Sequence, residues 1–336
     1  MKKFPVLFLL IFLSISCKND GPQAYTETGE ALGTTYRVKY FSSESFNTEK
    51  ALDSIFEVIN TSMSTYQDDS DISRINAGAE DVAVDIHFQK VFKLSKKIFK
   101  ESNGYFDPTV GSLVNAYGFG PDKPLNEPDE VILDSIRQLV GFEKVNLTGD
   151  NTIQKENPNI YLDFNAIAKG YTIDVIAEYL NSKNVENYLI ELGGELVAKG
   201  QNIEKEADWV VAIDNPQQTD AERTLQTVLA LKNRALATSG NYRKFRVDTT
   251  TGKRFVHTIN PLTGEAEKND LLSASVLAEN CTLADGYATA FMALGYEKSL
   301  EMLKNLENVD VYFIYADEQE SLRVFTSTGF EEVLRD

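Results

Sequence analysis

The segment YLDFNAIAKGYTID (Tyr161 to Asp174) places a carboxylate and a lysine among small residues. It is predicted to begin as a short apolar strand that ends at Asp163. It should continue as an amphipathic helix, because apolar residues recur at helical spacing at Ile173, Ile176, Ala177 and Leu180. Asp163, Lys169 and the backbone around Ala166 therefore lie at a strand-to-helix junction, where backbone groups are unpaired and can bind a ligand. A lysine at the start of a helix can bind a phosphate as a point charge. The commoner alternative for Lys169 is a surface lysine on a solvated helix face.

A second segment, ADGYATA (Ala284 to Ala290), pairs an acid with a hydroxyl one helical turn apart. On a helix, Asp285 and Thr289 share a face because they stand at positions i and i+4. Both side chains offer oxygen, the ligand atom that Mg²⁺ prefers. Alternatively, Asp285 caps the helix and Thr289 packs inward, and this segment taken alone favours that alternative.

His257 opens the segment HTINPLTG, beside a turn that contains proline and glycine. A neutral imidazole is a natural general base near neutral pH, so His257 is a candidate for accepting a proton. The alternative is a histidine that only hydrogen-bonds the loop backbone.

Glycine turns and aromatic rings supply the remaining candidate contacts. Gly193-Gly194 and TSGNY (Thr238 to Tyr242) would let main chain approach a ligand, unless they are ordinary tight turns. A planar cofactor could stack on an aromatic ring, although several of these rings are expected to pack in the core. The candidate rings are Tyr66, Tyr105, Phe106, Tyr117 and Phe119. Rossmann and P-loop sites are excluded, because neither glycine motif occurs in the required context.

The charge balance excludes a nucleic-acid surface. The chain has 336 residues and a formal net charge of -18, whereas nucleic-acid binding needs stripes of lysine and arginine. An acidic protein that binds an anionic cofactor must bring a local cation, and Mg²⁺ is the obvious candidate.

The first 24 residues indicate export. Residues 1–16 have the basic start and short apolar core of a signal peptide, too short to span a membrane. Cys17 follows at the position of a lipidated cysteine, although Ser14 stands where leucine is usual, and residues 17–24 are expected to form a tether. The alternative is an ordinary signal-peptidase site nearby that leaves Cys17 as a free thiol. We therefore expect an extracytoplasmic protein, lipid-anchored to a bacterial membrane and facing the periplasm.

The remaining residues, 25–336, are expected to form one functional unit of the α+β class, with largely antiparallel sheets flanked by helices. Strands outnumber connecting helices, and the spacing is typical of hairpins. Helices are predicted over 49–63, 88–101, 129–140 and 283–294, a polar loop over 65–76, and a hairpin from 145–149 and 160–163. Further strands are predicted at 35–41, 188–192, 209–213, 228–232, 235–238, 255–259, 273–278, 309–316 and 322–326.

Taken in chain order, these segments resemble the ApbE-type FAD:protein FMN transferases, a family of flavin transferase lipoproteins. The matching segments cover nearly all of residues 30–295. They are LGTTY, STYQDDSDISRIN, GYFDPTVGSLVNAYGFG, DFNAIAKGYTID, ELGGEL, ATSGNY, HTINPLTG and ADGYATA.

The resemblance implies an ApbE-like (T-fold-like) core and the transfer of FMN from FAD to a threonine or serine hydroxyl of a target protein, with release of AMP. It also implies targets that are flavin-accepting subunits of membrane redox complexes. By the same resemblance, the carbonyl of Ala166 with Asp285 and Thr289 would bind Mg²⁺, and His257 would activate the incoming hydroxyl. The implied FAD contacts are Leu32, Tyr66, Tyr105, Phe106, Asp107, Asp163, Lys169 and Ile259.

The chain departs modestly from the family pattern. Many relatives have tryptophan at the position of Tyr117, and a glycine near the position of Ala166. Two other activities stay open: a Mg²⁺-dependent FAD pyrophosphatase, and a non-catalytic flavin-binding lipoprotein. Tyr66 argues against the first, since an aromatic residue there accompanies transfer in this family. The metal and base motifs argue against the second, because binding alone needs neither.

Overall fold

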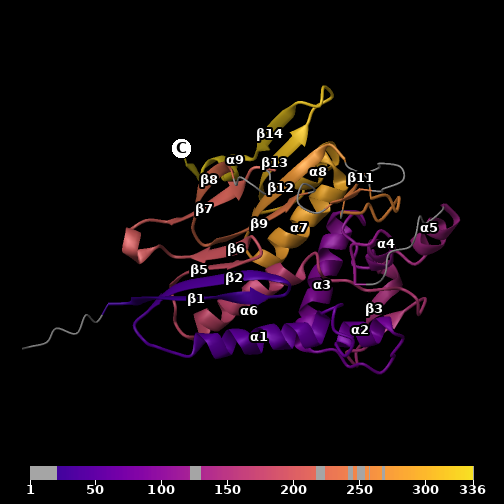
Figure 1. Ribbon diagram of the computed structural model, residues 1–336, viewed down its shortest axis with the longest axis horizontal. Helices are drawn as coiled ribbons and strands as arrows, with labels where there is room; N and C mark the ends of the chain where they lie inside the picture. Colours follow the sequence, from indigo (N-terminus) through magenta and orange to yellow (C-terminus); the bar gives the residue numbers. More distant parts are fainter. Residues whose placement is uncertain are drawn as a thin grey trace, which may run out of the picture.

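A large antiparallel sheet organises the structure (Figure 1). The computed structural model describes residues 21–121, 130–216, 224–240, 245–247, 254–256, 258–266 and 269–335. Within these residues, eight strands form the sheet in the order β1-β2-β5-β6-β9-β12-β13-β14. Every neighbouring pair is antiparallel, which confirms the predicted α+β class.

The strands of the large sheet are β1 (Gln23–Ala31), β2 (Thr34–Ser42), β5 (Asn187–Leu192), β6 (Glu195–Lys199), β9 (Arg234–Gly240), β12 (Leu271–Ala278), β13 (Asp310–Ala316) and β14 (Leu322–Thr326). A second, three-stranded sheet contains β7 (Trp209–Asp214), β8 (Leu225–Leu231) and β15 (Leu334–Arg335). Two separate hairpins pair β3 (Val145–Leu147) with β4 (Ile153–Lys155), and β10 (Phe245–Val247) with β11 (Arg254–Val256).

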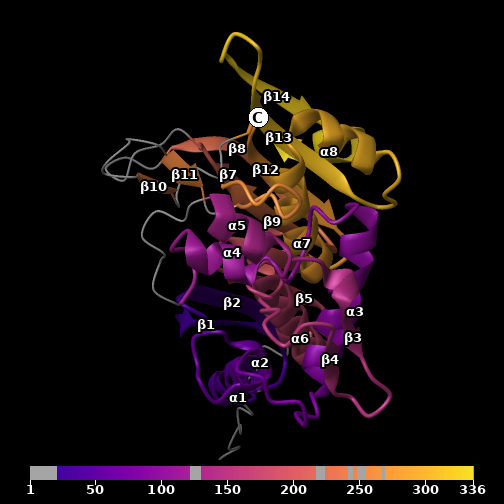
Figure 2. The ribbon, with the colours of Figure 1, turned by 90° about the vertical axis from the view of Figure 1, so that its right-hand side faces the viewer.

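The longer helices are α1 (Thr48–Met63), α3 (Ile86–Glu101), α6 (Ala168–Ser182) and α7 (Cys281–Leu294). The shorter ones are α2 (Asp71–Asn76), α4 (Gly111–Ala116), α5 (Glu130–Arg137), α8 (Tyr296–Leu303), α9 (Thr328–Glu331) and the 3-10 turns η1 (Phe142–Lys144) and η2 (Ile203–Lys205). Helices α4 and α5 lie together (Figure 2).

The two faces of the large sheet bury different cores, because successive strand residues point to opposite faces. One face packs with the long helices in the main core, to which β5 and β6 contribute Ile190, Leu192 and Val197. The other face packs with the second sheet around Trp209, where Leu196 is buried. Glu195 pairs with Leu192 across β5 and β6, so Glu195 belongs to the face covered by helices.

Helices α6 and α7 approach each other unusually closely at Gly170. A Cβ atom on Gly170 would lie 2.3 Å from Cys281 O and 2.8 Å from Asp285 Cβ, so only glycine fits. Asp174 of α6 also accepts hydrogen bonds from Cys281 N and Thr282 N, both at 2.8 Å, in the first turn of α7. A carboxylate at a helix N-terminus is favourable, so Asp174 of α6 stabilises the first turn of α7.

Some predicted elements differ from the structure. Residues 160–163 form no strand, and β3 pairs with β4 instead. Backbone groups of Leu162 bond the side chain of Asn76, at 2.8 Å in both directions, which replaces a strand ladder. The polar loop predicted over 65–76 contains α2, which Ser70 caps. Strand β1 begins inside the segment expected to be a tether.

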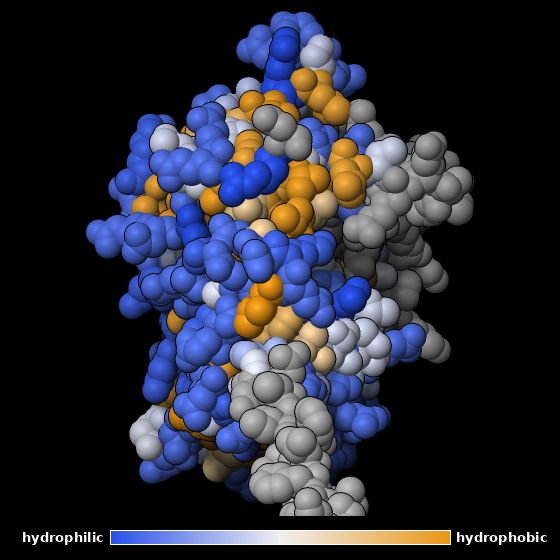
Figure 3. Space-filling view, turned by 90° about the vertical axis from the view of Figure 1, so that its left-hand side faces the viewer, coloured by the Kyte–Doolittle hydropathy of each residue, from blue (hydrophilic) through white to orange (hydrophobic). Residues whose placement is uncertain are grey.

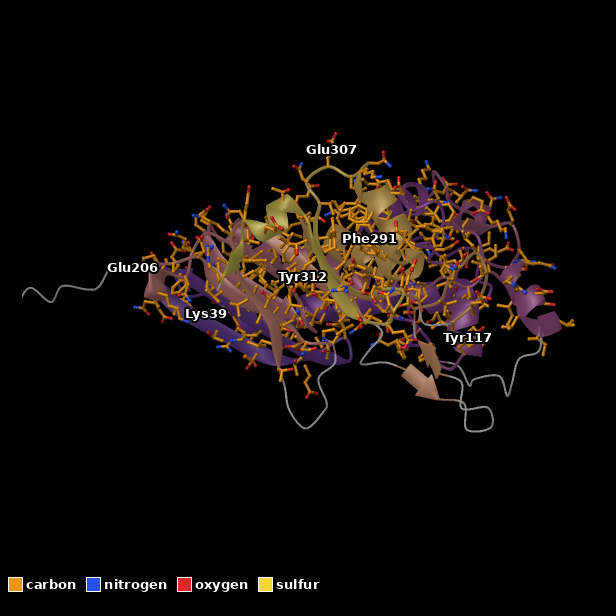
Figure 4. The ribbon with its side chains drawn as sticks, turned by 90° about the horizontal axis from the view of Figure 1, so that it is seen from above. Lys39, Tyr117, Glu206, Phe291, Glu307 and Tyr312 are labelled. Carbon is orange, nitrogen blue, oxygen red and sulfur yellow. The ribbon has the colours of Figure 1, made fainter. Side chains whose placement is uncertain are left out.

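Hydrophilic side chains predominate on the face shown in Figure 3, with apolar ones in small groups among them. No helix of the described residues is long and apolar enough to cross a bilayer. Figure 4 shows Tyr117 at the opposite end of the molecule from Lys39 and Glu206, while Phe291 lies in the interior.

Candidate functional site

Three charged side chains meet where α6, α7 and β6 converge. Lys169 Nζ donates a hydrogen bond to Glu195 Oε1 at 2.7 Å and lies 3.8 Å from Asp285 Oδ2. Asp285 Oδ2 also accepts a hydrogen bond from Gly170 N at 3.0 Å. Asp285 and Glu195 are 2% and 5% exposed. The structure thus brings the predicted phosphate-binding lysine and the predicted metal-binding acid into one buried charge cluster.

The charges in this cluster perturb one another strongly. Burial raises the pKa of the Asp285 carboxyl, an effect that Lys169 opposes and Glu195 reinforces. Burial alone would lower the pKa of the Lys169 ammonium, but the charges of Asp285 and Glu195 outweigh it and raise that pKa. With both acids ionised, two carboxylates face one ammonium. The excess negative charge favours binding of a further cation.

The sequence left open whether Asp285 merely caps its helix. The structure gives that role to Asn280, whose side chain accepts a hydrogen bond from Leu283 N at 2.9 Å. Asp285 lies further along α7 and faces α6 instead. Thr289 is partly exposed on the next turn. Asp285 is therefore free of the capping role, and its carboxylate is available to the site.

The residues that the resemblance assigns to Mg²⁺ suit that ion chemically. A carboxylate, a hydroxyl and a main-chain carbonyl form an all-oxygen donor set, as Mg²⁺ prefers. Ala166 lies in the turn directly before α6. In the described part of the chain, no group of three or more His, Cys, Asp and Glu side chains could hold a metal. Mg²⁺ commonly binds one or two carboxylates and completes its shell with water and substrate phosphate, so a site with a single acid ligand fits.

The segments around Asp107 and Asp163 lie against each other. Asp163 N donates a hydrogen bond to Pro108 O at 2.8 Å, and a Cβ atom on Gly111 would lie 3.1 Å from Asp163 Cβ. Asp163 Oδ1 accepts a hydrogen bond from Asn165 N at 2.7 Å, and burial raises the pKa of this carboxyl. Phe106 is buried beside them.

The carboxylate of Asp107 is already bonded within the protein. Its Oδ1 accepts from Thr109 N at 2.7 Å and Thr109 Oγ1 at 2.6 Å, and its Oδ2 accepts from Phe142 N at 3.1 Å. Burial raises its pKa, against the effect of these hydrogen bonds. This geometry indicates that the side chain fixes the loop, which leaves the backbone of the loop to meet a ligand.

Tyr66 is 64% exposed. Partial desolvation and, second, the charge of Asp163 raise the pKa of its hydroxyl. Thr65, its neighbour, accepts a hydrogen bond from Asn165 Nδ2 at 3.2 Å. An exposed ring beside the loop of Asp163 is available for stacking with a ligand.

Tyr105 points toward α8. Its hydroxyl accepts a hydrogen bond from Lys298 Nζ at 2.5 Å, and that ammonium lies 4.9 Å from the ring centroid. The ring lines a pocket of about 340 Å³ together with residues of α8. The described contacts of the Tyr105 side chain are thus with α8.

Leu32 occupies the turn between β1 and β2 with φ +50°. Large side chains rarely adopt this conformation, and such outliers gather at functional sites. The turn lies beside the turn from β5 to β6, because Gly193 N donates to Thr35 O at 3.0 Å. Leu32 is therefore placed near Glu195, on the same end of the sheet.

Ile259 is buried in a small separate core with Leu113, Val140 and Ala266. His257 lies outside the described residues. The loop that follows it contributes Leu262 to a pocket of about 440 Å³, which is also lined by Lys100, Asp107 and Arg137. This pocket adjoins the loop of Asp107 rather than the charge cluster.

Glu195 was not among the predicted site residues. It stands directly after Gly193 and Gly194, which adopt φ of +63° and +100°. The sequence did contain a signal for Glu195, because an acidic residue directly follows two glycines. A turn of this kind lets the backbone approach a ligand closely. The segment ELGGEL contributes to the family resemblance and its glycines were candidate ligand contacts, but no site role was predicted for Glu195.

Comparison with known sequences identifies the family. A sequence model of the ApbE family matches residues 32–313. The chain belongs to the ApbE family. A curated FAD:protein FMN transferase from Haemophilus influenzae is 36% identical over 321 residues, which cover 92% of this chain and 91% of that protein. The FAD:protein FMN transferase from Vibrio cholerae is 33% identical over 341 residues and covers 99% of each chain.

Solved structures of ApbE proteins share the fold. Flavin transferase ApbE from Vibrio cholerae superposes with a TM-score of 0.82 at 32% identity, covering 93% of this chain and 100% of that one. The ApbE protein of Thermotoga maritima gives a TM-score of 0.81 at 26% identity and covers 94% and 100%. These similarities confirm the predicted family and fold class.

Proposed function

We propose that this chain is a Mg²⁺-dependent FAD:protein FMN transferase. It transfers FMN from FAD to a threonine or serine hydroxyl of a target flavoprotein and releases AMP. Membership of the ApbE family and the names of its curated relatives support the transferase activity. The observation that carries the finer proposal is the buried cluster of Lys169, Glu195 and Asp285, which leaves negative charge for a cation beside a lysine for phosphate.

The chain's own residues would orient the substrate. Lys169 would bind the diphosphate of FAD as a point charge, and the exposed ring of Tyr66 would stack on a planar group. The Asp285 carboxylate, the Thr289 hydroxyl and the Ala166 carbonyl would hold Mg²⁺. When bound, the ion would neutralise the negative charge that develops on phosphate oxygens during the displacement.

His257 would accept the proton of the acceptor hydroxyl as that oxygen attacks the phosphorus on the FMN side of the diphosphate. The P–O bond to AMP breaks, and AMP leaves with the bonding electrons. General bases of this kind are typically worth roughly 10²–10⁴-fold in rate.

The proposal extends to location and partners. A lipidated Cys17 would anchor the enzyme to a bacterial membrane on its periplasmic side. Its partners would be flavin-accepting subunits of membrane redox complexes. The basic, apolar start of the sequence and its position directly before Cys17 support this part.

The deciding experiment incubates the protein with FAD, Mg²⁺ and an acceptor flavoprotein domain, and follows the acceptor by intact mass. We expect a mass gain equal to one FMN, lost with EDTA and lost when the acceptor threonine is replaced by alanine. The His257→Ala variant should still bind FAD but transfer FMN more slowly in a single turnover.

Other outcomes identify the two competing activities. Rapid release of FMN and AMP without an acceptor would indicate a pyrophosphatase. FAD that stays intact with Mg²⁺ and a cognate acceptor would indicate a flavin-binding protein without this catalysis.

A further inference from the structure

Glu195 holds one oxygen atom that the fold leaves unbonded. Its Oε1 accepts the hydrogen bond from Lys169 at 2.7 Å. Its Oε2 is buried and has no hydrogen-bond donor in the described residues. Solvent does not readily reach it, because the residue is only 5% exposed. The proposed mechanism uses Lys169 and Asp285 but assigns nothing to this oxygen.

The backbone N–H groups of the adjacent turn already donate hydrogen bonds to other acceptors, so they do not satisfy this oxygen. Gly193 N donates to Thr35 O at 3.0 Å, and Gly194 N donates to Glu191 Oε1 at 2.8 Å. A Cβ atom on Gly193 would lie 3.4 Å from Glu195 Oε2 and 2.9 Å from Thr34 Cγ2, so the oxygen lies at the β5–β6 turn beside the side chain of Thr34. Within the described residues, Glu195 Oε2 is thus an acceptor without a donor.

An unsatisfied buried acceptor is expensive. Leaving such a group without a partner costs the full desolvation penalty of that group, which is larger when the group is charged. Folded proteins rarely leave buried polar atoms in this state, and the exceptions call for a bound partner. The donor for Glu195 Oε2 should therefore arrive with a ligand.

We propose that Glu195 is a substrate-binding residue whose Oε2 accepts a hydrogen bond from a hydroxyl of bound FAD. This inference rests on the proposed function and deepens it. The diphosphate that Lys169 would bind carries no hydrogen-bond donor at neutral pH. The nearest donors in FAD are the hydroxyls of the two sugar chains that flank the diphosphate, the ribityl chain and the ribose.

The two oxygens of Glu195 then have different partners. Oε1 holds the ammonium of Lys169 in place beside Asp285, and Oε2 binds the sugar next to the diphosphate. One buried side chain would thereby set the distance between the phosphate-binding lysine and the substrate. Glutamine cannot replace it, because glutamine offers a single acceptor oxygen where glutamate offers two.

The test uses Glu195→Gln and measures FAD affinity by quenching of flavin fluorescence, in the presence of Mg²⁺ and without acceptor protein. Hydrogen bonds to charged groups contribute about 1.5–3 kcal/mol, so we expect FAD to bind roughly 10- to 150-fold more weakly. Glu191→Gln is the matched control: Glu191 pairs with Leu196 across the same hairpin, on the opposite face, and its substitution should leave FAD affinity near wild type. Urea unfolding of both variants checks that the hairpin is intact.

Substrate analogues identify the hydroxyl. FAD that lacks a ribityl hydroxyl and FAD that lacks a ribose hydroxyl are each titrated against wild type and Glu195→Gln. We expect wild type to lose affinity for one of the two analogues, and Glu195→Gln to bind that analogue about as well as FAD. The analogue that shows this coupling tells which sugar is bound.

Three outcomes would overturn the inference. In the first, Glu195→Gln binds FAD as tightly as wild type does. In the second, the substitution weakens binding of FAD and of both analogues by the same factor relative to wild type. In the third, wild type binds both analogues as tightly as it binds FAD. In the last case water satisfies the oxygen. Each of these leaves FMN transfer to the acceptor intact in wild type, whereas failure of the proposed function would appear as absent transfer or absent FAD binding in wild type itself.

Discussion

The acids of the candidate site have different kinds of partners in its two halves. In the helix half, formed by α6, α7 and β6, Asp285 and Glu195 face Lys169 from other elements of the chain. In the loop half, formed by residues 104–111 and 161–165, Asp107 and Asp163 bond mainly to groups a few residues away. The helix half keeps unbalanced charge and a free oxygen for a ligand. The loop half uses its acids to fix its own shape.

This difference predicts that substitutions in the two halves will separate binding from stability. Removing charge from the helix half should impair ligand binding while the fold survives. Removing an acid from the loop half should destabilise the fold more than it alters metal binding. Two substitutions, one in each half, test this division.

The largest effect is expected from Asp285→Asn. Asparagine keeps an acceptor for Gly170 N but removes the charge that would bind Mg²⁺. Loss of a residue that only supports a metal ligand typically weakens binding 10–100-fold, so we expect loss of the ligand itself to weaken Mg²⁺ binding by at least about 100-fold. Isothermal titration of Mg²⁺ in the presence of FAD measures this, and unchanged affinity would exclude Asp285 as a ligand. The urea midpoint should stay close to that of wild type.

Asp107→Asn should show the opposite pattern. The amide group of asparagine offers one acceptor oxygen in place of two, and its nitrogen would face the donor Phe142 N. We expect about 1–3 kcal/mol lower stability to urea, because a buried donor is left unpaired. Mg²⁺ affinity should change less than tenfold. If Asp107→Asn weakened Mg²⁺ binding as much as Asp285→Asn, the division into two halves would be wrong.

The sequence predicted the helix half well because its signals are local. The helical spacing of apolar residues predicted α6 and α7, and the i and i+4 positions of Asp285 and Thr289 predicted a shared face. It could not predict that Asp285 would bond Gly170, because these residues are 115 positions apart. Glu195 was missed for a related reason, since its importance depends on burial beside Lys169.

The loop half and the neighbouring residues 65–76 were predicted less accurately, because side chains replace the regular backbone pattern there. Residues 160–163 contain an apolar run typical of a strand, yet Asn76 satisfies the backbone of Leu162. Helix α2 was missed because most of its residues are polar, although Ile72 and Ile75 are buried at helical spacing. Only the tertiary structure shows which side chain takes the place of a neighbouring strand.

The smallest effect is expected from the packing of the helix half itself. Gly170→Ala would press a methyl group against the backbone of Cys281, whereas Gly286→Ala would meet side-chain atoms, first Ile98 Cδ1 at 2.4 Å, which is the far end of its side chain. Both glycines lie inside helices, where alanine is favoured over glycine by about 0.5–1 kcal/mol. Overpacking typically costs about 1–3 kcal/mol, so Gly170→Ala should be destabilised by a net 1–2 kcal/mol, roughly, and Gly286→Ala should be near neutral.

Both variants gain the same helix propensity. The difference between their urea midpoints therefore measures the cost of the contact between the new methyl group at position 170 and the backbone of Cys281. Gly170→Ala should also weaken Mg²⁺ binding, since a shift of α6 away from α7 separates Lys169 and Gly170 from Asp285. If Gly170→Ala were as stable as Gly286→Ala, α6 and α7 could separate without cost. Close packing would then not be what holds the charges of the helix half together.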